Sequence, residues 1–139
     1  VFLVYIRDKD FYRPLPQELG GGEQANGRIK VMAFPPLGIE TLAPVLRQRG
    51  HQVRMFDTCH PEMNDDAVVE AAADDKPDVI ALSFLSTTTY PTTKALARRL
   101  KERTPAIPII VGGVFATMNS DHLLHDCPDI DAVGIGEGE

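Results

Sequence analysis

Short apolar runs recur five times along the chain, and segments with helical periodicity separate them. The runs are Val1–Ile6, Val53–Phe56, Val79–Leu85, Ile107–Val111 and Ala132–Ile135. The third and fourth are nearly continuous in Val, Ile, Leu and Phe, which is typical of central parallel strands covered on both faces. The second alternates apolar and polar positions, so we expect it at an edge. Alternating strands and helices at this spacing predict right-handed crossovers and one parallel sheet.

Four helices are predicted between the strands from apolar positions spaced three and four residues apart. Gly50 is expected to end the first helix, and Asn64, Pro91 and Ser120 to begin the next three. The side chains expected to face the sheet are Ile39, Leu42, Ala43, Leu46, Val68, Val69, Ala72, Leu96, Ala97, Leu100, Leu123 and Leu124.

These elements predict an α/β domain of the flavodoxin-like, Rossmann-like kind: a five-stranded parallel sheet of order 2-1-3-4-5 with helices on both faces. Ligands bind such sheets beyond the carboxyl ends of the strands, where the strand order reverses. The long connection from Asp8 to Phe34 interrupts the pattern, and Ile29–Met32 within it competes with Val1–Ile6 for the first strand. We favour Val1–Ile6 as the strand and the connection as a functional loop.

Size, charge and composition narrow the classes of protein. The 139 residues fit one domain over residues 1–139, and 43% of them are hydrophobic, enough for a core without disulfides. Fourteen basic against twenty acidic residues give a net charge of −6, so nucleic-acid binding is not expected. No apolar run approaches the ~20 residues of a membrane span. Two separate cysteines suit a reducing cytoplasm.

The candidate chemistry follows the predicted strands. The loop after the third strand, from Ser83 to Tyr90, includes Leu85 and is rich in hydroxyl side chains, those of Ser83 and of Ser86 to Thr89. Because the loop precedes a helix, we expect these hydroxyls to face the ligand edge. The alternative is that Thr88 or Thr89 simply caps that helix. Gly112-Gly113 after the fourth strand allows a close backbone approach. Gly134 to Glu139 lacks the strand and helix context of a dinucleotide fingerprint, so we reject that interpretation.

The sequence gives less support for three other kinds of site: a metal site, a nucleophilic site and a phospho-receiver site. His122, His125 and Cys127 have a spacing that can bind metal, but a fourth ligand is not evident, so we expect no metal site. Cys59-His60 has no partners for a nucleophilic triad. A phospho-receiver needs an aspartate at the end of the third strand, where Ser83-Phe84-Leu85 stands instead.

Several motifs together resemble the cobalamin-binding domain that precedes the catalytic domain of cobalamin-dependent radical S-adenosylmethionine enzymes. The motifs that carry the resemblance, in chain order, are Phe34-Pro35-Pro36-Leu37-Gly38, Leu42 to Val53, Pro77 to Ser83, Val111-Gly112-Gly113 and Gly136 to Glu139. In the wider superfamily an Asp-x-His-x-x-Gly motif supplies a histidine to cobalt. Here Ala33 replaces the aspartate and Pro35 the histidine, and only Gly38 remains.

The resemblance implies a cofactor-binding set but no catalytic residue and no protein metal ligand. Ser83, Gly112 and Gly113 would wall a slot for the nucleotide tail, with a Cβ at Gly112 blocking the tail and straining the turn. The turn from Pro35 to Gly38 would lie under the corrin ring. The full expected cofactor-binding set is Pro35, Leu37, Gly38, Ser83, Leu85, Ser86, Thr87, Thr88, Thr89, Gly112, Gly113, Val114, Gly134, Gly136, Glu137 and Gly138.

The resemblance further implies a methyltransferase or anaerobic cyclase as the parent enzyme. Its iron–sulfur cluster and S-adenosylmethionine would belong to a C-terminal radical domain that is the partner of this one, because Cys59 and Cys127 are too few and too far apart for a cluster. This chain alone is therefore expected to be inactive. The alternative is a flavodoxin-like module that binds flavin mononucleotide or a partner protein. The position of the hydroxyl-rich loop after strand three rather than strand one favours cobalamin.

Overall fold

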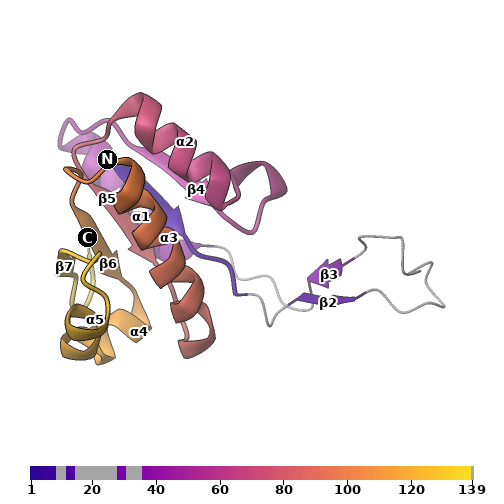
Figure 1. Cartoon of the computed structure of the whole chain (residues 1–139). Coiled ribbons are helices and arrows are strands. Elements are labelled where there is room, and N and C mark those ends of the chain that lie inside the picture. The colour runs from indigo at the N-terminus through magenta and orange to yellow at the C-terminus, as the bar shows by residue number, and fades with distance from the viewer. Residues whose placement is uncertain (9–11, 15–27, 31–35, 139) are drawn as a thin grey trace.

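A five-stranded parallel sheet forms the centre of the molecule in a computed structural model that describes residues 1–8, 12–14, 28–30 and 36–138 (Figure 1). Its strands, in chain order, are β1 (Phe2–Tyr5), β4 (Arg54–Asp57), β5 (Ile80–Ser83), β6 (Ile109–Gly112) and β7 (Ala132–Val133). They lie in the order β4-β1-β5-β6-β7, and every neighbouring pair is parallel. This confirms the predicted order 2-1-3-4-5, with the alternating strand β4 at an edge.

The competing first strand is resolved in favour of the N-terminal run. β3 (Arg28–Lys30) overlaps the alternative run Ile29–Met32, but it pairs antiparallel with β2 (Tyr12–Pro14) in a separate two-stranded sheet. Most of the connection from Asp8 to Phe34 lies outside the described residues, so its predicted role as a functional loop stays a prediction.

The helices form where the apolar periodicity predicts them, with three additions, α4 and two short 3₁₀ turns. They are α1 (Leu37–Gln48), α2 (Asp65–Asp75), α3 (Tyr90–Arg103), α4 (Val114–Met118) and α5 (Ser120–Asp126), with short 3₁₀ turns η3 (Pro61–Met63) and η4 (Thr87–Thr89). Asn64 caps α2 by accepting a hydrogen bond from the Ala67 amide at 3.0 Å. Gly50 has a φ of 88° and lies one residue beyond the cap of α1, the usual place of a helix-ending glycine. Helix α4 and the 3₁₀ turns are too short to leave a periodic signal.

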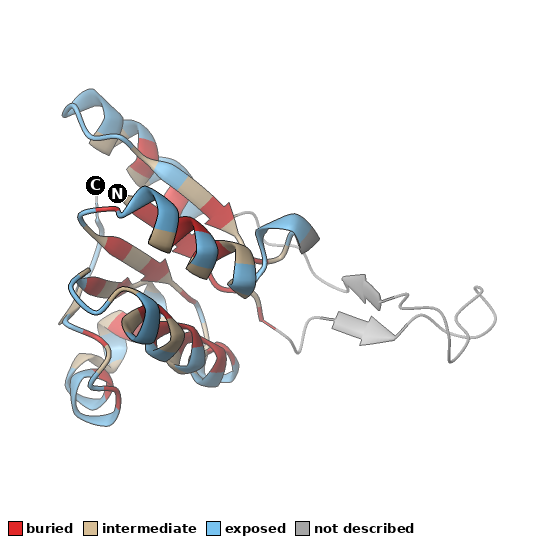
Figure 2. Cartoon of the chain, turned by 45° about the horizontal axis from the view of Figure 1, so that its top comes forward, coloured by how far each residue is buried: buried red, intermediate tan, exposed pale blue. Residues whose placement is uncertain are grey.

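One face of the sheet is closed by α2, α3, α4 and α5, and we call it the sealed face. Large strand side chains point into it from β1, β5 and β6, and each is at most 3% exposed: Phe2, Val4, Ile80, Leu82, Ile109 and Val111. The helices bury their apolar residues against these (Figure 2). Leu123 of α5 is fully buried as predicted, whereas the prediction for Leu124 is wrong, because this side chain is 45% exposed on the outer side of the helix.

The opposite face, which we call the open face, is covered differently. Among the described helices only α1 contributes to its apolar cluster, where Ile39 and Ala43 pack on Leu3 and Tyr5 of β1. The open-face positions of β5 and β6 are small or half-buried: Ala81, Ser83, Ile110 and Gly112. The expectation that both central strands are covered on both faces is therefore wrong. Of the five strands of this sheet, only β1 is buried at all four positions, and α1 packs against it.

No helix among the described residues is both long enough and apolar enough to cross a membrane.

Candidate functional site

A cavity of about 230 Å³ lies on the open face, between α1 and the segment that follows β7; we call it the slot. Its walls come from the sheet, from the first turns of α1 and from residues 134–138. The lining residues are Leu3, Gly38, Ile39, Leu42, Ala81, Leu82, Ser83, Ile110, Val111, Gly112, Gly113, Gly134, Ile135, Gly136, Glu137 and Gly138.

A second cavity of about 440 Å³ adjoins the slot at the carboxyl edge of the sheet; we call it the platform cavity. It is lined by Tyr5, Pro36, Leu37, Gly38, Ser83, Leu85, Gly113, Val114, Thr117, Met118, Gly136 and Glu137. The two cavities have five lining residues in common, so they form one continuous site: Gly38, Ser83, Gly113, Gly136 and Glu137. The site lies where ligands bind in sheets of this order.

Small residues create the slot. Ser83 of β5 is paired in register with Gly112 of β6, and both line the slot. A Cβ built on Gly112 meets nothing within 4 Å, so a larger side chain there would project into empty space rather than into protein. The expectation that a side chain at Gly112 blocks the slot is compatible with this geometry, but the expectation that it strains the turn is wrong.

The strain falls on the next residue. Gly113 has a φ of 102°, a conformation that side chains rarely adopt, and a Cβ there would lie 2.5 Å from the backbone oxygen of Phe84. Glycine at this position lets the chain leave β6 close to the end of β5, at the mouth shared by the two cavities.

Apolar side chains exposed to solvent surround the platform cavity. Leu37, Leu85, Val114 and Met118 all line it, and each exposes between 43% and 78% of its surface. Apolar side chains left in water do not contribute the free energy of burial to folding. A cluster of such exposed side chains therefore indicates a surface that a ligand covers. A flat, largely apolar ligand edge fits this rim.

Three hydroxyls of the row after β5 bond to a carboxylate of the chain itself. Asp8, only 7% exposed, accepts hydrogen bonds through Oδ2 from Ser86 at 2.6 Å, from Thr88 at 2.6 Å and from Thr89 at 3.3 Å. None of the residues from Ser86 to Thr89 lines either cavity. These hydroxyls satisfy a buried carboxylate at the end of β1, and the loop they fix carries Leu85 into the platform cavity.

Tyr5 is the phenol among the lining residues. Burial raises its pKa above the ordinary value of 10, and the nearby Cys59, Asp57 and Asp8 raise it further because they add negative charge. The phenol of Tyr5 therefore stays protonated to a higher pH than that of a free tyrosine.

The four histidines lie outside the site. None lines the slot or the platform cavity; His51 lines a separate cavity of about 700 Å³ beside the amino ends of β1 and β4. His122 and His125 are exposed on α5, whereas Cys127 is fully buried. Within the described ranges, no group of three or more His, Cys, Asp or Glu side chains could hold a metal ion.

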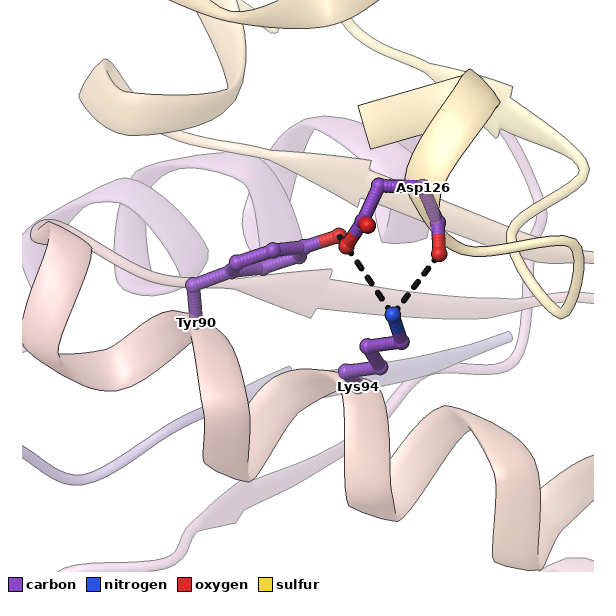
Figure 3. Close-up of polar contacts among 3 residues, drawn as sticks. All are labelled: Tyr90, Lys94 and Asp126. Carbon is purple, nitrogen blue, oxygen red and sulfur yellow. Dashed lines mark hydrogen bonds and ion pairs between the residues drawn. The ribbon is translucent and has the colours of Figure 1, made fainter. Parts of the chain in front are cut away.

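Polar contacts join α5 to α3, two of the helices that cover the sealed face (Figure 3). The Tyr90 hydroxyl donates to Asp126 Oδ2 at 2.7 Å, and Lys94 Nζ donates to the same oxygen at 2.9 Å and to the Asp126 backbone oxygen at 2.7 Å. The hydrogen bond from Tyr90, together with Lys94, lowers the pKa of Asp126. Burial, and then the bond to Asp126, raises the pKa of Tyr90 above its ordinary range.

Most of the predicted site residues converge. The structure brings together Leu37, Gly38, Ser83, Leu85, Gly112, Gly113, Val114, Gly134, Gly136, Glu137 and Gly138. Ser86, Thr88 and Thr89 lie apart in the cluster around Asp8, Thr87 lines neither cavity, and Pro35 lies outside the described residues. The lining residues that sequence reasoning missed are Leu3, Tyr5, Ile39, Leu42, Ala81, Leu82, Ile110, Val111, Thr117, Met118 and Ile135. Ala81 and Ser83, alternating with the large Ile80 and Leu82, were the available signal for an uncovered face.

Sequence comparison links this geometry to known proteins. The family described as B12 binding domain matches residues 31–139. The chain is 33% identical over 113 residues to the anaerobic magnesium-protoporphyrin IX monomethyl ester cyclase of Synechocystis, a match that covers 81% of this chain and 23% of that protein. It is 35% identical over 109 residues to the hopanoid C-3 methylase of Methylococcus capsulatus, and this match covers 78% of this chain and 21% of that protein. It is 29% identical over 125 residues to the cyclase of the same name from Rubrivivax gelatinosus, and this match covers 89% of this chain and 21% of that protein.

The chain thus spans about a quarter or less of the length of these relatives. The family match includes α1, every strand of the main sheet except β1, and nearly all residues of both cavities. With the flavodoxin-like sheet order and a slot of small residues on its open face, the chain belongs to the B12-binding domain family.

Proposed function

We propose that this chain is the cobalamin-binding module of a radical S-adenosylmethionine enzyme, a methyltransferase or an anaerobic cyclase, and that it holds cobalamin without a histidine ligand. The observation that carries the proposal is the slot of glycine and other small residues that opens directly into an apolar-rimmed cavity at the carboxyl edge of the sheet. The names of the cyclase and methylase relatives support the class of parent enzyme.

The residues divide between two parts of the cofactor. Ser83, Gly112 and Gly134 would hold the planar base of the nucleotide tail in the slot, because they line it without large side chains. Leu37, Leu85, Val114 and Met118 would cover the edge of the corrin ring and exclude water from it. When bound, the cofactor supplies a cobalt centre that carries a methyl group, and the protein contributes binding and orientation.

The lower face of the ring has no nitrogen ligand in this proposal. The cavity residues include no histidine, lysine or arginine side chain among those that the structure describes. Pro35, which replaces the ligating histidine of the wider superfamily, cannot ligate cobalt, because its ring nitrogen is an amide nitrogen with no free lone pair. An unligated lower face favours the low-coordinate cobalt(I) state, which suits a methyl carrier.

Titration of the chain with hydroxocobalamin and, separately, with flavin mononucleotide tests the binding function. After removal of free ligand on a desalting column, we expect the absorbance of the corrinoid to remain with the protein and that of the flavin to be lost. Retention of flavin without corrinoid would support the flavodoxin-like alternative and contradict the proposal.

Electron paramagnetic resonance of the bound cobalt(II) form tests the missing ligand. We expect no superhyperfine splitting from a protein nitrogen. Splitting that disappears in His122→Ala or His125→Ala would show that α5 supplies a ligand and that the histidine-free assignment is wrong.

The chemistry of the parent enzyme would depend on a further domain. Cys59 is half-buried and Cys127 fully buried, and no third cysteine is present in this sequence to hold an iron–sulfur cluster. We therefore expect no 5′-deoxyadenosine when this chain is incubated anaerobically with a reductant and S-adenosylmethionine. Formation of that product by the pure chain would contradict the assignment of the radical chemistry to another domain.

A further inference from the structure

Thr117 joins two segments of the site through one side-chain oxygen. Its Oγ1 donates a hydrogen bond to the backbone oxygen of Gly113 at 3.0 Å and accepts one from the backbone amide of Gly136 at 3.1 Å. Thr117 itself is half-buried in α4 and lines the platform cavity. The hydroxyl thus connects the turn after β6 with the segment after β7.

Both partners of Thr117 lie at the mouth shared by the two cavities. Gly113 and Gly136 each line the slot and the platform cavity, and both have a positive φ, of 102° and 82°. Their backbones therefore shape the passage that connects the base end of the site with the ring end. A change in the distance between these two turns would open or close that passage.

The segment after β7 has few other fixed points. The Gly134 amide donates to the Val111 backbone oxygen at 2.8 Å, which continues the pairing of β7 with β6. Among the described residues 135–138, the structure shows one hydrogen bond made by a backbone group, from the Gly136 amide to Thr117 Oγ1. These residues are exposed, so packing alone fixes them weakly.

We propose that Thr117 is a positioning residue that holds the wall formed by residues 136–138 against the turn at Gly113 and thereby sets the affinity for cobalamin. This inference rests on the proposed function for its ligand. It does not rest on that function for its geometry, because the hydroxyl bridge is present in the chain itself. The oxygen acts through the two backbones and needs no contact with the cofactor.

Two variants separate the oxygen from the shape of the side chain. Thr117→Val keeps the branched shape but removes both hydrogen bonds, whereas Thr117→Ser keeps the hydroxyl. Thr104→Val is a matched control. The Thr104 hydroxyl donates to the Leu100 backbone oxygen at 2.8 Å, also four residues back along the chain, but at the C-terminal cap of α3 and away from both cavities.

Two measurements are made on each variant. The first is the exchange rate of the Gly136 amide with water, measured by NMR in the cofactor-free protein. The second is the dissociation constant for hydroxocobalamin from an absorbance titration. In Thr117→Val we expect faster exchange at Gly136 and a dissociation constant raised about five- to tenfold, because the bond that fixes Gly136 against α4 is lost. Thr117→Ser and Thr104→Val should behave as the unmodified protein.

The two readouts keep this inference separate from the proposed function. Unchanged exchange at Gly136 in Thr117→Val would overturn the bridge whether or not cobalamin binds. Faster exchange with unchanged affinity, or equal weakening in Thr117→Ser, would overturn its role in binding. Failure of the unmodified protein to bind hydroxocobalamin would instead overturn the proposed function and, with it, the link from the bridge to affinity.

Discussion

The two faces of one sheet differ in what their strands place on them. On the sealed face β5 and β6 present Ile80, Leu82, Ile109 and Val111, all at most 1% exposed beneath α2 to α5. On the open face the alternate positions of the same strands are small or half-buried, and a cavity replaces the helix that would cover them. Because side chains alternate between faces, one strand can serve stability on one side and binding on the other.

The comparison shows what the site costs the fold. Filling the open face with side chains as large as those of the sealed face would bury more apolar surface, at about 25 cal/mol per Å². The chain instead keeps Ser83 and Gly112 side by side over empty space. Stability is therefore concentrated on the sealed face, and the open face is free to accept a ligand.

Truncation of neighbouring residues in β6 tests this division with the largest expected effect. Ile109 is 1% exposed on the sealed face, whereas Ile110 is half-buried beside the slot. We expect Ile109→Ala to lower the free energy of unfolding by about 3–4 kcal/mol, and Ile110→Ala by about 1–2 kcal/mol because part of its surface is already in water. Urea denaturation measures both. Equal losses would show that the two faces contribute alike.

Adjacent glycines provide the next test. Gly113→Ala should lower the free energy of unfolding by about 1–3 kcal/mol, because alanine is strained at this φ and its Cβ approaches the Phe84 oxygen. Gly112→Ala should leave the free energy of unfolding nearly unchanged, because its Cβ enters the slot. Thermal melting followed by circular dichroism compares the two. A larger loss at Gly112 would mean that the slot is closed in solution.

The cluster around Asp8 is the third test. Asp8→Ala leaves the hydroxyls of Ser86, Thr88 and Thr89 without their buried acceptor and should cost about 2 kcal/mol. Asp8→Asn keeps one acceptor oxygen and should cost less. Urea denaturation measures both variants. If the two cost the same, the carboxylate oxygen does not hold the loop.

The contacts between α3 and α5 should give the smallest effect, visible mainly as a pH dependence. The raised pKa of Tyr90 means that its bond stabilises the fold below about pH 10 and that this contribution declines as the pH rises further. The lowered pKa of Asp126 means that its contribution is present above about pH 4 and is lost as the pH falls. We expect Tyr90→Phe to reduce the melting temperature slightly at pH 7 and to flatten its decline above pH 10. An unaltered alkaline profile would contradict the role of this bond.

The sequence predicts the sheet better than it predicts the site. Apolar runs and helix caps such as Asn64 carry local signals, so the strand order and four helices are predictable. Gly113 and Gly134 are also predictable, because each directly follows a strand. The partner of the hydroxyls at Ser86 to Thr89 is not, since Asp8 lies 78 or more residues away along the chain. Thr117 is missed for the same reason, because its bond to Gly136 depends on how α4 packs.

The most direct test of the central claim compares cobalamin with cobinamide, the corrinoid that lacks the nucleotide tail, on the unmodified chain and on Gly112→Val. If the open-face slot holds the tail, cobalamin should bind the unmodified chain at least about tenfold more tightly than cobinamide, equivalent to ~1.4 kcal/mol. Gly112→Val should remain folded by circular dichroism and bind the two corrinoids equally, because its side chain fills the slot. Equal binding of cobalamin and cobinamide by the unmodified chain, or an unchanged preference in Gly112→Val, would contradict the claim.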